Sequence, residues 1–225
     1  MRRIFFIKKY IYQIGCFASV VFVFLSCFYA HTISKVETVY IGKSFYFLVS
    51  KNTHVEAGAY DIALQGGAGY LLEDNGREYV AWGVYLTEHE AQKVEVGLRE
   101  DTITLQKSVE KLYFKTPKEK NNGAVVKNTL SWLNDCIEIL DLETKRLENG
   151  ATQESSKRIL RDMQKQFAFM GKEYKTQDLS FANVCENAAN ALETICLSTV
   201  FVKDLRYLEC ELCFSYLKLS ERFYL

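Results

Sequence analysis

The chain has 225 residues, 48% apolar and 25% charged, a composition typical of folded proteins and not of disordered ones. This length allows one or two small domains and excludes a large multidomain enzyme. The zero net charge is unevenly distributed. Four basic residues and no acidic ones precede residue 31, so 31–225 holds 24 basic (28 less four) and 28 acidic residues, a net of −4. Because binding to phosphates requires a basic surface, no nucleic acid partner is predicted.

The first element is an uncharged apolar segment over residues 10–30. Its 21 residues, YIYQIGCFASVVFVFLSCFYA, contain one strongly polar side chain, Gln13. As a helix they would span about 30 Å, the thickness of the hydrocarbon core of a bilayer. The basic residues before this segment predict that 1–9 is a cytoplasmic tail, and that 31–225 lies outside the cell membrane.

Three kinds of N-terminal segment have this composition. A cleaved signal peptide needs small residues at its cleavage site, where Phe28 is too large. A lipoprotein would use Cys27, but the preceding Phe24-Leu25-Ser26 matches such a site poorly. An uncleaved signal anchor needs neither feature, so we favour a single-pass protein held in the lipid bilayer.

Residues 41–115 contain strand patterns separated by helical ones. A tight turn at Asp74-Asn75-Gly76 is expected between two of the strands, because Asn and Gly tolerate positive φ. The alternation of aromatic and β-branched residues, or short apolar runs, predicts strands at 44–50, 70–72, 78–86 and near 112–114.

Two helices are expected between these strands. One covers VEAGAYDIALQ and is stopped by the Gly66–Gly69 run. The other begins at Thr87, which can form a capping box with Glu90, and extends to about Arg99. The resulting order, β-α-β-β-α-β, is the split arrangement of ferredoxin-like α+β domains. The helices are predicted to cover one sheet face and leave the other open; the covered face would carry Phe45, Phe47, Val49, Val80, Trp82 and Val84.

Two stretches of this region, FYFLVS and EYVAWGVYLTEHEAQKV, resemble the sporulation-related repeat (SPOR) family of peptidoglycan-binding domains. Gly83, Tyr85 and Ala91 stand where that family has a glycine, an aromatic residue and a helical alanine. The resemblance covers about a third of the chain. It implies a membrane-anchored cell-envelope protein, acting in cell division, sporulation or general wall upkeep, that binds peptidoglycan glycan strands across the open sheet face.

The glycan-binding positions that the resemblance implies are Tyr46, Leu48, Tyr79, Ala81 and Tyr85. Family members often have Gln on the first strand and Arg on the third, and this chain has Leu48, Tyr79 and Ala81 at those positions. The three tyrosines would stack on sugar rings and donate hydrogen bonds from their hydroxyls. Alternatively, they cover an exposed sheet or pack against another segment of the chain.

Residues 122–225 follow a polar segment, 116–123, that is typical of a linker, and show only helical periodicity. A first helix ends at Asn149-Gly150, and a second runs from about Thr152 to Tyr174. A third, from about Asp178, carries an apolar heptad over six repeats, interrupted only by two residues, Ser198 and Glu209.

Two arrangements fit this all-α region. One is a three-helix antiparallel bundle with a long or kinked last helix, and the other is a coiled coil that recruits another chain. The third helix is longer than its partners. Its C-terminal half is therefore expected to pack on the first domain or to form a homodimer.

No catalytic residue, metal site or cofactor is predicted. His89 has the position of a first-turn surface residue, and the histidine spacing does not match a zinc site. Cys210 and Cys213 form a single CxxC on a helix, where a bridge would strain the backbone. The default for the five cysteines of 122–225 is a buried apolar thiol. The alternative to glycan binding is a scaffold whose helical domain pairs with envelope or division proteins; a thiol enzyme is least supported.

Overall fold

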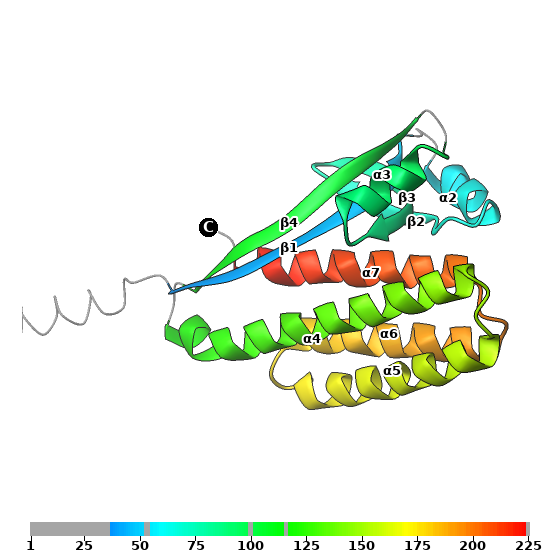
Figure 1. Cartoon of the computed structure of the whole chain (residues 1–225). Coiled ribbons are helices and arrows are strands. Elements are labelled where there is room, and N and C mark those ends of the chain that lie inside the picture. The colour runs from blue at the N-terminus through cyan, green and yellow to red at the C-terminus, as the bar shows by residue number, and fades with distance from the viewer. Residues whose placement is uncertain (1–36, 52–54, 99–100, 115–116, 224–225) are drawn as a thin grey trace, which may run out of the picture.

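A computed structural model describes residues 37–51, 55–98, 101–114 and 117–223 (Figure 1). The predicted tail 1–9 and anchor 10–30 lie outside these residues. Within the part described, no helix is both long and apolar enough to cross a membrane. The elements in chain order are β1 (Glu37–Ser50), α2 (Val55–Leu64), β2 (Tyr70–Asp74), β3 (Arg77–Tyr85), α3 (Glu88–Glu95), β4 (Thr102–Phe114), α4 (Pro117–Glu148), α5 (Gln153–Tyr174), α6 (Leu179–Leu197) and α7 (Val202–Glu221).

The four strands form one antiparallel sheet in the order β2-β3-β1-β4. The predicted α+β class and the order β-α-β-β-α-β are confirmed. Asn75 and Gly76 both have positive φ, 51° and 72°, as the two-residue turn between β2 and β3 requires. β4 is much longer than the short strand expected near 112–114.

Helices α2 and α3 cover one sheet face, as predicted, but of the six residues predicted there only Val80 and Trp82 lie beneath them; Phe45, Phe47, Val49 and Val84 lie on the opposite face. β1 and β3 pair with an irregularity at which β3 has one more residue than β1, so Val49 lies opposite Ala81 and Phe47 opposite Val84. Val80 and Trp82 therefore face away from Val49. The core beneath α2 and α3 consists of Leu48, Ile62, Val80, Trp82, Tyr85 and Ala91.

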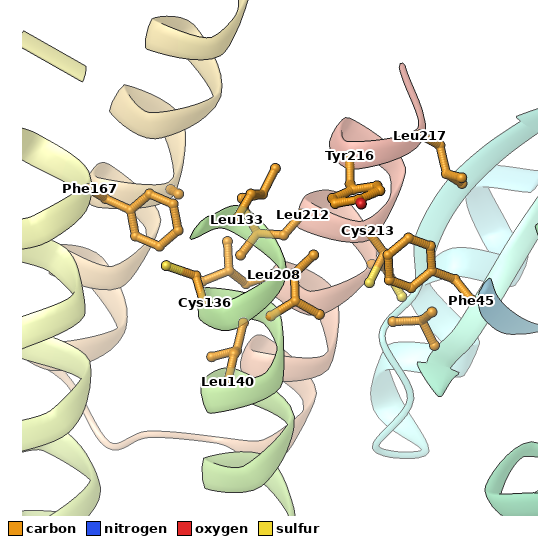
Figure 2. Packing of buried hydrophobic residues seen from close by; sticks show 14 of the residues in the cluster. Phe45, Leu133, Cys136, Leu140, Phe167, Leu208, Leu212, Cys213, Tyr216 and Leu217 are labelled. Carbon is orange, nitrogen blue, oxygen red and sulfur yellow. The ribbon is translucent and has the colours of Figure 1, made fainter. Parts of the chain in front are cut away.

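The opposite sheet face is covered by α7, so the prediction of an open face is wrong. Phe45 is fully buried and its ring meets that of Tyr216 edge to face, with centroids 5.4 Å apart. Tyr70 of β2 packs in the same way on Tyr207, at 5.3 Å. Figure 2 shows Cys213 and Tyr216 of α7 beside Phe45. The reason is that both faces of β1 are apolar and require cover.

The helical region differs from prediction at two points. α4 begins at Pro117, inside the segment interpreted as a linker; proline suits the first helical position because its missing N–H has no partner there. The third predicted helix is two helices, since α6 ends at Leu197 and α7 starts at Val202. The link between them is fixed by Gln153, whose amide bonds both the N–H and the C=O of Val200.

One continuous core joins the sheet to the helices. α4 and α7 pack on each other and both contact the sheet, while α5 and α6 form a pair on the far side of α4 and α7 (Figure 1). In Figure 2, Leu208 and Leu212 of α7 lie toward Leu133 and Leu140 of α4. The expectation that the C-terminal half of the third helix packs on the first domain is thus confirmed. The apolar cluster runs without interruption from Phe47 to Phe167.

Candidate interaction surface

The five predicted glycan-binding residues do not share a surface. Tyr46, Leu48 and Tyr85 pack in the core beneath α2 and α3, whereas Tyr79 and Ala81 belong to the core beneath α7. Leu48 and Ala81 are fully buried and Tyr85 is 7% exposed. Only Tyr46 and Tyr79 are partly exposed, on opposite sides of the sheet. The alternative, that these residues pack inside the chain, is the one observed.

The Tyr85 hydroxyl is used inside the protein. It accepts a hydrogen bond from Arg206 Nη1 at 2.7 Å, and Arg206 also donates to Glu148 Oε1 through Nε at 3.0 Å. Burial raises the pKa of Tyr85, although the nearby guanidinium opposes the shift. These three residues join β3, α7 and α4 at one junction, which makes it a structural tie between the layers.

A buried carboxyl lies one turn further along α7. Glu209 is 4% exposed, and burial raises its pKa to about 8. It forms a hydrogen bond with Thr144 of α4, whose hydroxyl also bonds the Leu140 carbonyl at 2.9 Å. Because a hydroxyl has one proton, Thr144 can donate to Leu140 only if protonated Glu209 donates to Thr144. The polar interruption of the heptad thus marks a neutral hydrogen-bonded pair between α4 and α7.

Half of the predicted capping box at α3 is present. The Glu90 amide donates to the Thr87 hydroxyl at 3.3 Å, which satisfies one free helix donor. The Glu90 carboxylate instead accepts from Lys145 of α4 at 2.6 Å, and Lys145 also reaches Asp141 at 2.9 Å. The side chain expected to close a local cap therefore ties α3 to α4.

Two adjoining hollows of about 350 and 450 Å³ lie where the β2–β3 hairpin meets the C-terminal half of α7. The Lys218 ammonium lies 5.2 Å from the centre of the Phe214 ring and pairs with Glu221 at 3.2 Å. Lys107 and Asp74 form a second ion pair on the rim. The residues shared by both hollows are Leu72, Glu73, Asn75, Phe214 and Lys218. We call this region the hairpin cleft.

The hairpin cleft has an apolar floor and a mixed, mostly acidic rim, which suits a polypeptide segment with apolar and basic side chains. Among the described residues, no group of histidine, cysteine, aspartate and glutamate side chains could hold a metal ion. Sequence reasoning missed this cleft. Its only local signal was the Asn75-Gly76 turn, which predicts a hairpin but not which helix packs against it.

The five cysteines between Cys136 and Cys213 are buried and unpaired, which confirms the prediction of buried apolar thiols. Burial raises the pKa of Cys136 and of Cys185 to about 12. A thiol with so high a pKa is a poor nucleophile at neutral pH.

Comparison with known proteins gave no similarity that could guide an assignment. No family model matches the chain, and neither a curated protein nor a solved structure matches it. The SPOR resemblance therefore rests on its two short stretches alone.

Proposed function

We propose that this chain is a membrane-anchored, non-enzymatic interaction protein of the cell envelope. Its sheet is a structural scaffold, and the outer surfaces of its helices contact partner proteins. The observation that supports this proposal over glycan binding is the position of α7. A helix that buries Phe45 and packs Tyr216 on it occupies the surface on which a sugar chain would lie.

Removing α7 from the sheet to admit a glycan would be costly. Each large apolar side chain that it shields contributes about 1.5–3 kcal/mol on burial. The buried residues of α7 that lie toward the sheet include Cys213, Tyr216 and Leu217 (Figure 2). Together with the burial of Phe45 and Phe47, their burial is comparable with the net stability of an ordinary domain, so α7 is a permanent part of the fold.

The anchoring half of the proposal comes from the uncharged 10–30 segment, which precedes β1 by six residues. The proposal that the outer helices contact partner proteins is supported by their exposed apolar side chains. Leu142 of α4 is 56% exposed, and Phe169 of α5 is 61% exposed. Large apolar groups on the surface of a helix are common points of protein contact.

In-cell photocrosslinking of the full chain tests this proposal. A photoreactive residue at position 142 or 169 should give discrete protein adducts, whereas one at Lys93, an exposed position on α3, should give few. In parallel, the detergent-solubilised chain is sedimented with purified peptidoglycan, with and without its stem peptides. Sedimentation that is lost in a Tyr46→Ala, Tyr79→Ala double variant would support glycan binding instead.

A further inference from the structure

We propose that the outer edge of β2 is a docking site for an extended segment of a partner protein, which adds as a fifth strand and carries a basic residue followed by apolar ones. This inference goes beyond the proposed function, because it concerns the sheet edge and not the outer helices. It rests on the backbone of β2, the charge of the hairpin and the apolar side chains beside it, among them Phe214 in the hairpin cleft.

The backbone of β2 offers hydrogen-bonding groups to a new strand. β2 is the end strand of the sheet, and no other described strand pairs with its outer side. The two-residue Asn75-Gly76 turn makes the flanking pair, Asp74 and Arg77, a hydrogen-bonded pair. Because such pairs alternate along an antiparallel ladder, Leu71 and Glu73 direct their N–H and C=O groups away from β3.

The far edge of the sheet is better protected than β2. On β4, the Tyr113 amide donates to the Phe223 carbonyl at 2.7 Å, so the chain after α7 covers the C-terminal end of that strand. β4 also carries Lys107 and Lys111, and lysines on an edge oppose the addition of further strands. β2 has no lysine, and its Leu71 is 50% exposed.

The charge of the hairpin identifies the partner's chemistry. Glu73 and Glu78 are directly opposite in the β2–β3 ladder and both are exposed. They form a non-hydrogen-bonded pair, in which side chains are closest, and like charges there are destabilising. No described lysine or arginine forms an ion pair with either. A basic side chain on an added strand beside Glu73 would relieve this repulsion.

The apolar surroundings define the neighbouring positions. In an antiparallel added strand, the residue two places after the basic one lies opposite Leu71, and the residue between them points to the other side of the strand. On that side Tyr70 packs on Tyr207, which is 45% exposed, and Phe214 lines the hairpin cleft. The expected motif is therefore basic–apolar–apolar. A second copy of this chain is a poorer occupant, because it would bring two acidic hairpins together.

Fluorescence anisotropy with labelled peptides tests the inference on the full chain in nonionic detergent. The probe is a capped peptide, Thr-Lys-Leu-Val-Thr-Val, and its control has Glu in place of Lys. The Lys peptide should bind about two- to thirtyfold more tightly, since one cross-strand attraction replaces one repulsion. Glu73→Lys should reverse this preference, an outcome that a misfolded variant could not produce.

A second test removes a backbone hydrogen-bond donor from the outer edge of β2. Leu71→Pro removes the outward N–H without breaking the β3 ladder, and should abolish binding of the Lys peptide. The inference is overturned if neither peptide binds at 1 mM, if both bind equally, or if Glu73→Lys leaves the preference unchanged. It is also overturned if Leu71→Pro instead dissociates a homodimer. None of these results alters the adducts at positions 142 and 169, so the two proposals fail separately.

Discussion

The buried carboxyl between α4 and α7 predicts an unusual dependence of stability on pH. Burial raises the pKa of Glu209 from 4.5 to about 8; the hydrogen bond with Thr144 and the neighbouring Arg206 oppose that shift, and Asp141 and Glu148 add to it. Below pH 4.5 the carboxyl is protonated in both the native and the unfolded state. Between pH 4.5 and 8 only the native state retains the proton, so unfolding releases it and stability falls as pH rises.

The size of this effect follows from the two pKa values. Each pH unit in that window costs about 1.4 kcal/mol, so Glu209 destabilises the fold by about 3 kcal/mol at pH 7, relative to a group that stays neutral. Glu209→Gln keeps the shape and can still donate to Thr144. It should therefore stabilise the protein by roughly that amount at pH 7 and by only about 0.8 kcal/mol at pH 5.

Thermal unfolding of the full chain in nonionic detergent, followed by far-UV circular dichroism, measures the difference. For a protein of this size, about 3 kcal/mol corresponds to a rise in Tm of roughly 6–12 °C at pH 7. Glu221→Gln is the control, since that side chain is about half exposed on the same helix. Parallel curves of Tm against pH for the wild type and Glu209→Gln would refute the assignment of a neutral buried carboxyl.

Three further predictions concern the core, the thiols and the turns. Phe45→Ala should cost about 3–5 kcal/mol, and hydrogen exchange should then rise in α5 as well as in the sheet, because the core is continuous; a rise confined to the sheet would contradict this. Peptides containing Cys210 and Cys213 should resist thiol labelling at pH 8 until denaturant is added, as peptide mass spectrometry can show, since burial holds their pKa values well above the ordinary range. Gly69→Ala should lower the midpoint of urea unfolding more than Gly150→Ala does: both have positive φ, but only at position 69 would the new Cβ lie 2.5 Å from a backbone oxygen, and equal midpoints would argue against that contact.

Features encoded by a few neighbouring residues could be predicted from the sequence. The Asn75-Gly76 turn, the helix stop at Gly150 and the Thr87 cap each depend on the conformational freedom or hydrogen bonding of residues close together in the chain. The α+β class and the order of elements follow from the same local signals. These predictions succeeded because no distant segment was needed to specify them.

Features set by distant partners could not be predicted in the same way. The pairing of Val49 with Ala81 depends on an irregularity in the β1–β3 ladder, and alternation alone assigned Val49 to the wrong face. The division of the predicted third helix into α6 and α7 could not be predicted either. Ser198 and Glu209 both interrupt the heptad, yet one lies at the end of α6 and the other lies buried against Thr144. A heptad cannot distinguish a break from a buried polar pair.

The sequence does contain one signal that both faces of the sheet are covered, namely the composition of strands β1 and β3. A strand with one solvated face alternates polar and apolar residues, whereas the run FYFLV of β1 does not, and β3 reads YVAWGVY. Such strands need cover on both sides, and α2 and α3 supply only one layer. The second layer must come from elsewhere in the chain, and α7 has apolar residues facing both the sheet and α4. Once both faces are filled, a ligand or partner can approach the sheet only at its edges. Phe223 covers the C-terminal end of β4, and Lys107 and Lys111 lie along the same strand, so the acidic hairpin of β2 is the edge less protected against an added strand.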